Sequence, residues 1–445
     1  MSEATAILEY PVELPVRGHY DVVVAGGGPA GIAAAIAAGR SGAKVCLIEH
    51  QGMLGGIWTA GLLTLILDSK KKPGLIVEIR NELRRRDAIE PTRDLYDAEA
   101  MKLVLEDLCQ RAGVEVRLYT RLVSAKLAGR RMTHVILEAK EGRFAIAGDA
   151  FVDTTGDGDL AARAGCQFDL GRAEDSLLQP MSLLAMLSGV PESIRKAPFK
   201  GATSGCCVDK DWLYQMLVAA GCTPSYTKPS LFPLSNGLCC LMSNHIYEKS
   251  PLNSVDLTAA SIQARKELHE AVAAMRTFPG GEWSEVQVVA SAPHIGVREG
   301  RRIRGRFHIT LEDLLVGRKH VDAVTRVTFP IDVHSIMKSE GGGYGRDSAA
   351  APSLPYDIPL RALIAADVDN LAMAGRCISG DFHAHASYRV TGNAVTTGEA
   401  AGIFASHLAR TGCDANSYEA SGVLAELEAF RQACEARACE PRALV

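Results

Sequence analysis

The hydrophobic positions of the chain alternate between short β-branched runs and Ala-rich segments, a pattern typical of α/β proteins. Residues 20–25 form an apolar run that ends at three glycines, as expected of a buried parallel strand entering a tight turn. Residues 32–40 predict a helix whose many alanines leave little side-chain bulk against the sheet. Residues 44–49 predict a second strand. A β-α-β unit of about 30 residues is therefore expected to open the fold.

The same sheet is expected to continue through the next hundred residues and to be completed near the C-terminus. The predicted elements are a helix over 97–111, a strand over 114–119, an antiparallel patch over 122–146 and a strand over 150–156. Residues 370–375 are apolar again and precede a long Ala-rich segment over 394–408. The chain is therefore predicted to return to its first domain.

We accordingly predict an α/β fold with a discontinuous Rossmann-like nucleotide-binding domain and an inserted α+β domain. Between the two parts of the first domain the composition shifts toward Pro, Met and Cys, which suggests a separate, substrate-facing domain. The predicted boundaries are 1–165 for the first part, 166–343 for the substrate domain, 344–412 for the returning segment and 413–445 for a C-terminal helical tail.

Composition and charge place the chain among ordinary globular enzymes. Its 445 residues are 47% apolar, with a formal net charge of −4 and no dense Lys/Arg run, so nucleic acid is not expected as a partner. Without an apolar run of about 18 residues, no membrane span is predicted. Residues 1–20 do not resemble a secretion signal, and a cytoplasmic location is expected. A homo-oligomer is left open.

No metal site is predicted from the twelve cysteines. The adjacent pairs Cys206-Cys207 and Cys239-Cys240 lack the Cys-x-x-Cys spacing that lets two thiolates reach one zinc ion. They are interpreted as small buried hydrophobic residues in a reducing compartment.

The glycines after the first strand carry the clearest chemical signal. Gly26-Gly27-Gly28-Pro29-Ala30-Gly31 fits Gly-x-Gly-x-x-Gly at a strand-to-helix turn, where backbone amides and a helix N-terminus can approach a pyrophosphate. Glu49 ends the next strand, where a carboxylate can accept hydrogen bonds from an adenosine ribose. His50 follows it directly and is included in the predicted site.

Further segments decide between NAD and FAD. These are Leu54-Gly55-Gly56, Asp153-Thr154-Thr155-Gly156-Asp157-Gly158-Asp159, Ala374-Gly375-Arg376-Cys377-Ile378-Ser379 and Gly398-Glu399-Ala400-Ala401-Gly402. Together with the glycine turn they resemble the FAD-dependent oxidoreductases with a glutathione-reductase-like fold. Members of this family also carry elements similar to Arg298-Glu299-Gly300-Arg301-Arg302-Ile303 and Tyr356-Asp357-Ile358-Pro359. The resemblance covers nearly the whole chain and implies FAD, by default bound without covalent attachment.

A looser likeness links the chain to the flavoproteins of fumarate reductase and succinate dehydrogenase. It rests on Gly380-Asp381-Phe382-His383-Ala384-His385 and Arg389-Val390-Thr391-Gly392-Asn393-Ala394. The likeness implies that Arg389 holds a substrate carboxylate and that the helix start at Gly392, Asn393 and Ala394 faces the flavin pyrimidine. The chain lacks counterparts of their His-x-x-Met-Gly-Gly loop, which argues against fumarate reduction. A second Gly-x-Gly-x-x-Gly unit and a Cys-x-x-x-x-Cys pair near Gly55 are also missing, which argues against a disulfide reductase.

Residues near the flavin ring are the candidates for catalysis, because the protein must orient a substrate and handle one proton. His383 and His385 are candidate general bases, and Arg389 is a candidate anion contact. Weaker substrate candidates are Arg298, Arg302, His334 and Tyr356, of which His334 is accompanied by Asp332. The alternative for the arginines around Glu299 is an ordinary solvated surface.

The sequence therefore predicts an FAD-dependent dehydrogenase or oxidase. It would take a hydride from a small organic substrate onto flavin N5 and pass electrons to an acceptor that the sequence does not identify. Two alternatives stay open: an FAD-dependent reductase of an activated double bond, and a non-catalytic FAD subunit of an electron-transfer complex.

Overall fold

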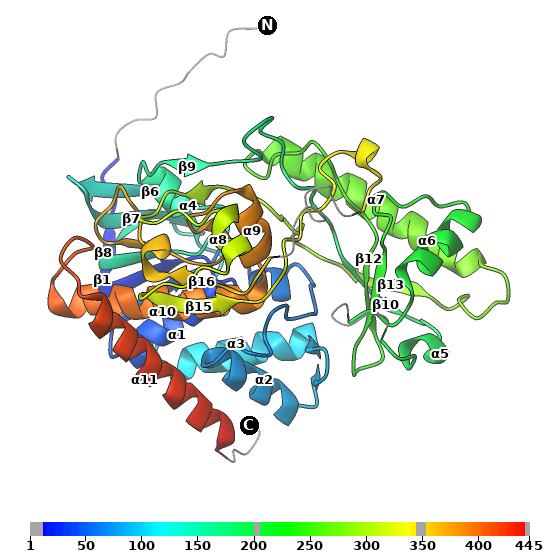
Figure 1. The fold of residues 1–445 in the computed structure, drawn as a ribbon, viewed down its shortest axis with the longest axis horizontal. Coiled ribbons are helices and arrows are strands. Elements are labelled where there is room, and N and C mark those ends of the chain that lie inside the picture. Colours follow the sequence, from blue (N-terminus) through cyan, green and yellow to red (C-terminus); the bar gives the residue numbers. More distant parts are fainter. Residues whose placement is uncertain (1–11, 200–204, 344–352, 441–445) are drawn as a thin grey trace, which may run out of the picture.

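A seven-stranded sheet organises the larger part of the molecule (Figure 1). The computed structural model describes residues 12–199, 205–343 and 353–440. Strand β1 (Val16–Ala25) lies inside the sheet, between β2 (Val45–Ile48) and β8 (Gly142–Asp153), and pairs with both in parallel. β5 (Glu115–Arg117) follows β2, and helix α1 (Pro29–Arg40) connects β1 to β2. The expected β-α-β unit is therefore confirmed.

Strand β8 has both antiparallel and parallel neighbours within this sheet. Its first half pairs antiparallel with β7 (Arg131–Ala139), which in turn pairs with β6 (Arg121–Ala128). β8 also pairs in parallel with β1 from Ala145 onward, and its last residues pair in parallel with β17 (Leu371–Met373). The strand formed after residue 370 therefore returns to the first sheet, as predicted.

Helices cover this sheet and position the ends of its strands. α10 (Thr391–Thr411) packs along α1, and α11 (Ala420–Cys439) packs on α10 and on α2 (Leu75–Arg85). α3 (Ala98–Arg111) begins one residue later than predicted, because Asp97 is its N-cap and accepts hydrogen bonds from the amides of Glu99 and Ala100. No helix within the described residues is long and apolar enough to cross a membrane.

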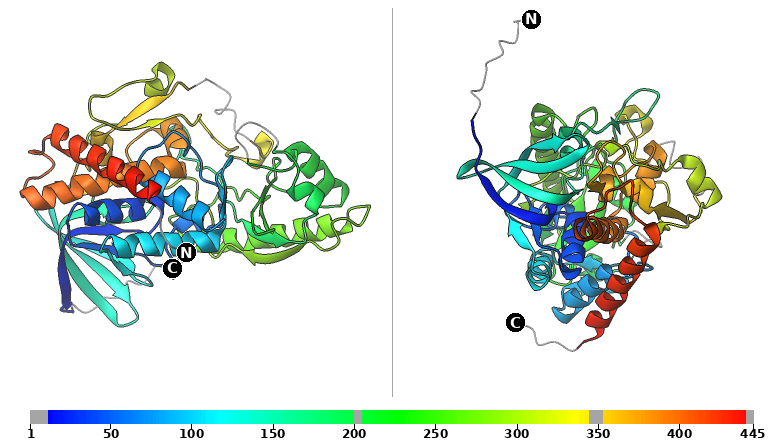
Figure 2. Two further views of the ribbon diagram at one scale, coloured as in Figure 1. Left: turned by 90° about the horizontal axis from the view of Figure 1, so that it is seen from below. Right: turned by 90° about the vertical axis from the view of Figure 1, so that its left-hand side faces the viewer.

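A second, smaller sheet lies at one end of the long axis of the molecule (Figure 2). It is antiparallel, in the order β11 (Ser230–Pro233), β12 (Cys239–Met242), β10 (Ala185–Ser188) and β13 (Gln287–Ser291). α5 (Glu192–Arg195), α6 (Lys210–Ala219) and α7 (Ser254–Thr277) accompany it. This unit has a hydrophobic core of its own, into which Leu65 and Leu95 of the larger part also pack.

The chain after β13 returns to the larger core. Ile303, Val324 and Val333 pack there, and β15 (Ala323–Val327) pairs antiparallel with β16 (Tyr356–Pro359). α9 (Phe382–Tyr388) directly precedes α10. Shorter elements complete the molecule: β3 (Ile89–Glu90), β4 (Leu95–Tyr96), α4 (Asp159–Arg163), β9 (Phe168–Asp169), β14 (Arg302–Ile303) and α8 (Leu311–Val316). The predicted mixed α/β fold with a parallel sheet is confirmed.

Candidate active site

The glycine turn between β1 and α1 has room for a ligand at one position and none at two others. A Cβ atom at Gly26 would lie 2.6 Å from the carbonyl oxygen of Thr154, and one at Gly31 would lie 1.8 Å from that of Gly26. Among the described residues, a Cβ atom at Gly28 would meet no atom within 4 Å, and no side chain caps the start of α1 there. The amides of the first helical turn are thus available for an anion.

Glu49 is fixed beside this turn. Its carboxylate accepts hydrogen bonds from the amides of Gly27 and Gln51, both at 2.7 Å, and lies 2.9 Å from Nδ1 of His50. Burial alone would raise the pKa of Glu49, but these hydrogen bonds hold it below its usual value. A buried, ionised acceptor therefore stands where the sequence placed the ribose contact, while the ring of His50 is half-exposed.

Three neighbouring segments, at residues 55–56, 153–157 and 376, are held near the glycine turn by hydrogen bonds and close packing. The amide of Gly55 donates to the carbonyl oxygen of Gly27 at 2.8 Å, and a Cβ atom at Gly56 would come within 3.0 Å of the Gly28 Cα. Arg376 donates to Asp157 at 2.8 Å and to the carbonyl oxygen of Val297 at 2.6 Å. Asp153, at the end of β8, accepts hydrogen bonds from Thr155 and from the amide of Ala161.

The start of α10 is brought close to this turn although it lies more than 350 residues further along the chain. A Cβ atom at Gly398 would lie 2.2 Å from the carbonyl oxygen of Ala30, and one at Gly402 would lie 2.1 Å from that of Ala34. Gly375, two residues after the end of β17, donates its amide to the hydroxyl of Thr397 at 3.1 Å. The close approach of α1 and α10 therefore places two helix N-termini in one part of the molecule.

Buried polar atoms at the start of α10 lack partners. Thr391 and Asn393 are both buried. Within the described ranges, the hydroxyl of Thr391 and both side-chain polar atoms of Asn393 have no hydrogen-bond partner. The amide of Gly392 donates to the carbonyl oxygen of Leu67, so the loop before α2 packs directly on this helix start. Native proteins rarely leave such groups unsatisfied, which points to a polar ligand at this position.

The two predicted histidines of α9 lie in different surroundings. His385 is fully buried, and in the part of the chain that the structure describes neither ring nitrogen has a hydrogen-bond partner. Burial and the positive charges of Arg302, Arg389 and Arg376 lower its pKa well below the ordinary value. His383 is half-buried, with its ring edge-on to Phe382. Residues two apart on a helix point to different sides, so we place only His385 with the arginines.

Arg389 belongs to a buried polar cluster. Its Nη2 donates to the carbonyl oxygen of Asp332 at 2.9 Å and lies 3.3 Å from the Asp332 carboxylate and 3.4 Å from Oε1 of Gln179. The Asp332 carboxylate also lies 3.4 Å from Nε2 of His334. Burial lowers the pKa of Arg389, while Asp332 and Glu299 oppose that effect.

Arg298 joins the same cluster from the segment after β13. It donates to the carbonyl oxygen of Pro180 at 2.7 Å and to the hydroxyl of Ser182 at 2.8 Å. Burial, followed by the charge of Arg389, lowers its pKa to about 10. Burial and Arg298 likewise lower the pKa of His334 to about 4, although Asp332 opposes them. The structure therefore gathers Arg298, His334 and Arg389.

The smaller unit contributes residues that the sequence did not reveal. The ring of His245 lies 4.2 Å from that of Tyr226 and 4.9 Å from that of His334, between ring centroids. Its Nδ1 lies 3.2 Å from the hydroxyl of Tyr247, and Asn244 beside it bonds to the backbone of Leu183 in both directions. No short motif marks His245, because contacts between distant segments create its surroundings.

Two of the weaker substrate candidates, Arg302 and Tyr356, are buried within the protein. Arg302 pairs with Glu299 at 2.5 Å and donates to the carbonyl oxygens of Gly171 and Gly380. Tyr356 is a fully buried residue of β16, and burial raises its pKa. The alternative of a solvated arginine surface around Glu299 is wrong for Arg298 and Arg302, since both are less than a tenth exposed.

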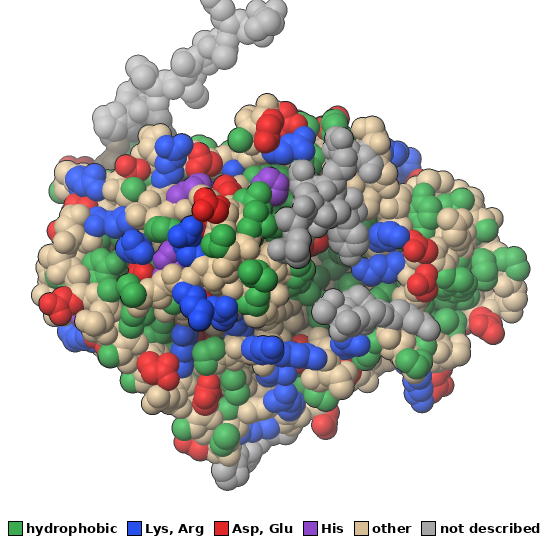
Figure 3. Space-filling model, viewed as in Figure 1, with side chains coloured by type: hydrophobic (Ala, Val, Ile, Leu, Met, Phe, Trp, Pro, Cys, Tyr) green, Lys and Arg blue, Asp and Glu red, His purple; other side chains and the backbone are tan. Residues whose placement is uncertain are grey.

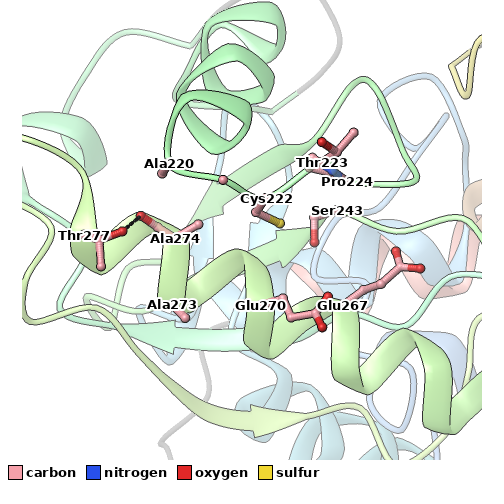
Figure 4. A pocket seen from close by; sticks show the side chains of 11 residues that line it. Ala220, Cys222, Thr223, Pro224, Ser243, Glu267, Glu270, Ala273, Ala274 and Thr277 are labelled. Atoms are coloured by element: carbon pink, nitrogen blue, oxygen red, sulfur yellow. Dashed lines mark hydrogen bonds between the residues drawn. The ribbon is translucent and has the colours of Figure 1, made fainter.

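A separate pocket of about 410 Å³ lies in the smaller unit, between α7 and the loop after α6 (Figure 4). Cys222, Ser243, Glu267 and Glu270 are among its lining residues, and none of the predicted site residues lines it. Ser225 donates to Glu267 at 2.5 Å and accepts from the amide of His245 at 2.9 Å, so the wall of this pocket adjoins the buried cluster. Figure 3 shows hydrophobic side chains in the hollow between the two parts of the molecule. Among the described residues, no group of three or more His, Cys, Asp or Glu side chains could hold a metal ion.

Comparisons with known proteins supply the family. The family model described as FAD dependent oxidoreductase matches residues 21–427. Dihydrolipoyl dehydrogenase of Trypanosoma brucei brucei is 52% identical over 42 residues, which are 9% of this chain and 9% of that enzyme.

Solved structures also align with most of the chain. A geranylgeranyl bacteriochlorophyll reductase-like protein from Thermoplasma acidophilum aligns over 95% of this chain and 88% of its own, at 12% identity and a TM-score of 0.42. An anhydrotetracycline hydroxylase from Streptomyces rimosus aligns over 94% and 69%, at 13% identity and a TM-score of 0.46. A flavin-dependent brominase aligns over 94% and 83%, at 14% identity and a TM-score of 0.47.

Proposed function

Because this chain belongs to the family of FAD-dependent oxidoreductases, with FAD as its cofactor, we propose that it oxidises a small organic substrate by hydride transfer to flavin N5. The observation that carries the proposal is the buried cluster of Arg389, Asp332, His334 and His385, in which His385 and Arg389 directly precede α10 in sequence and Asp332 pairs with Arg389. Such a cluster of perturbed titratable groups is typical of an active site.

The residues present fit FAD at both ends. The open space over Gly28 and the uncapped start of α1 suit its pyrophosphate, and the Glu49 carboxylate suits its ribose. The unpartnered side chains of Thr391 and Asn393 suit the polar edge of the flavin ring. The helix N-terminus of α10 would favour the negative charge of the reduced ring. When bound, FAD would supply the acceptor for one hydride, which carries two electrons.

The protein's own residues would orient the substrate and take up its proton. Arg389 presents a guanidinium group to the substrate, and Asp332 and Gln179 hold that group in place. His334 is neutral above about pH 4 and can therefore accept a proton, while Asp332 beside it stabilises the resulting imidazolium. His385, with neither nitrogen engaged among the described residues, is the second candidate base.

The reverse reaction is the second candidate. Two buried arginines, Arg298 and Arg389, could polarise an activated double bond for reduction, and this observation favours a reductase more than any other feature of the site. The electron acceptor would then be the substrate itself. For oxidation, the proposal leaves the acceptor to be identified.

The experiment is anaerobic reduction of the bound flavin by a panel of alcohols, amines and hydroxy acids, followed by its absorbance. We expect at least one donor to bleach the flavin, and we expect His385→Ala and Arg389→Ala to slow that bleaching at least tenfold while retaining FAD. Bleaching by external reductants alone, with reoxidation by activated alkenes, would establish the reductase instead. Unchanged rates in both variants would remove the proposed active site.

A further inference from the structure

The buried cluster carries one positive charge that no described carboxylate balances. Arg298, Arg302 and Arg389 contribute three guanidinium groups, and Glu299 and Asp332 contribute two carboxylates. The carboxylate of Glu299 pairs with Arg302. The carboxylate of Asp332, which pairs with Arg389, is then the one remaining negative charge in this cluster for the two positive charges of Arg298 and Arg389. His245, His334 and His385 add no charge near neutral pH, because burial lowers the pKa of each. An unbalanced buried charge is costly, so a site with this composition favours one bound anion.

The guanidinium groups of Arg298 and Arg389 contact two adjacent residues, Pro180 and Gln179. Arg389 contacts the side-chain oxygen of Gln179, and Arg298 donates to the carbonyl oxygen of Pro180, the next residue. The charge of Arg389 is also the largest electrostatic influence on Arg298 after burial itself. The segment at 179–180 thus keeps two like charges near each other, an arrangement that repels unless an anion lies between them.

Two side chains that contact each other, Arg389 and Gln179, also carry buried donors without a partner among the described residues. In the ranges that the structure describes, the Nε of Arg389 and the Nε2 of Gln179 are buried N–H groups without a hydrogen-bond acceptor. Gln179 uses its oxygen for Arg389 and for the amide of His334, so its NH2 group is left to another acceptor. A carboxylate supplies acceptors in a plane that suits guanidinium donors.

The smaller unit adds a second recognition element. His245 has no described partner for its Nε2, while its Nδ1 lies beside the hydroxyl of Tyr247. Its ring lies edge-on to that of His334, at 4.9 Å between centroids. A hydroxyl group of a ligand would be both donor and acceptor for such imidazoles.

We propose that the substrate is a 2-hydroxymonocarboxylate whose carboxylate lies between Arg298 and Arg389 and whose hydroxyl group faces His245 and His334. This inference rests on the proposed function. In the oxidation, the substrate carbon loses its hydrogen as a hydride with two electrons to FAD, and the hydroxyl proton passes to an imidazole. The C–O single bond becomes a carbonyl, and the product is a 2-oxo acid. The charge balance selects a monoanion over a dicarboxylate.

The test is equilibrium binding to the holoenzyme, measured by perturbation of the flavin absorbance and by isothermal titration calorimetry. The probes are butyrate, 2-hydroxybutyrate, the neutral 2-hydroxybutyramide and the dianion malate. We expect butyrate and 2-hydroxybutyrate to bind, the hydroxy acid more tightly, and the amide and malate to bind at least tenfold more weakly. Arg298→Met and Arg389→Met should each weaken carboxylate binding by about tenfold to a hundredfold, the range expected for a lost charged hydrogen bond.

Arg304→Met is the matched control, because Arg304 is an exposed arginine of the same segment that pairs with Asp169. It should bind the probes as the wild type does. FAD content and thermal midpoint are measured for every variant, and Arg298→Lys keeps the charge where Arg298→Met fails to fold. Equal binding of the carboxylate and the amide, or wild-type affinity in both Met variants, would overturn the inference.

The binding and turnover readouts separate this inference from the proposed function. Butyrate has no hydroxyl group to oxidise, so it reports on the anion site alone. Carboxylate binding without flavin reduction by any donor supports the anion site and removes the proposed oxidation. Flavin reduction by neutral alcohols without carboxylate binding overturns the anion site and leaves the oxidation standing.

Discussion

At the scale of single residues, the glycines of the first turn divide into two kinds. Gly31 leaves no room for a Cβ atom within the protein, whereas Gly28 faces open space and has an ordinary backbone φ of −74°. We predict that Gly28→Ala folds with wild-type stability but binds FAD at least tenfold more weakly, because the added methyl group occupies the approach to the pyrophosphate. Flavin release on dilution, followed by fluorescence, measures the affinity.

Gly31→Ala is the comparison within the same turn. Its methyl group would overlap the carbonyl oxygen of Gly26, so we expect a loss of roughly 1–3 kcal/mol in the free energy of unfolding together with the loss of FAD. Chemical denaturation of both apoproteins distinguishes the two effects. Equal destabilisation by the two substitutions would contradict the assignment of Gly28 to the cofactor.

The buried histidines make stability depend on pH. The pKa of His334 is about 4 in the folded protein and about 6.5 in the unfolded chain, so the unfolded state binds more protons between these values. Stability is therefore retained above about pH 6.5 and lost as the pH falls toward 4. We predict that His334→Gln reduces this slope by up to about 1.4 kcal/mol per pH unit, measured by urea denaturation at several pH values. Parallel curves for variant and wild type would contradict the shift.

At the scale of elements, the contact between α1 and α10 depends on missing side chains. We predict that Gly402→Ala costs about 1–3 kcal/mol of stability, because its Cβ atom would lie 2.1 Å from the carbonyl oxygen of Ala34 and force the helices apart. The matched control is Gly422→Ala in α11, where the nearest atom is 3.7 Å away and alanine should be neutral or stabilising by up to about 1 kcal/mol. Thermal unfolding of both variants measures the difference.

The elements that the sequence predicted are those fixed by local signals. Short stretches of sequence mark the boundaries of these strands and helices to within a few residues. Examples are the apolar run at 20–25, the glycine turn and Asp97 at the start of α3. The predicted strand over 114–119 is shorter in the structure, Glu115–Arg117, because only three of its residues pair with β2. The antiparallel sheet of β10 to β13 was not resolved from sequence, since its short strands pair across long separations.

The candidate site was predictable only where a motif marks it. Motifs and a family resemblance predicted the glycine turn, Glu49 and the start of α10 as parts of the site. The contact of each of these residues with FAD stays a prediction. Gln179, Tyr226 and His245 carry no motif, and they reach the site only because the two cores meet there. Arg298 could equally have been a surface residue, since its burial depends on the backbone of residue 180 and on Ser182.

At the scale of the whole molecule, the two segments that are predicted to bind FAD are distant in sequence and are brought together by the packing of α10 on α1. A ligand that bridges both should therefore protect residues 26–31 and 391–397 together from hydrogen exchange, while the β10–β13 sheet keeps its rate. ADP should protect only the first segment, because it contains the pyrophosphate but lacks the flavin ring. FAD at a hundredfold above its Kd should also stabilise the protein by about 2.7 kcal/mol. Protection of the first segment alone by FAD would show that the start of α10 does not reach the ring, and its unpartnered Asn393 would then require another ligand.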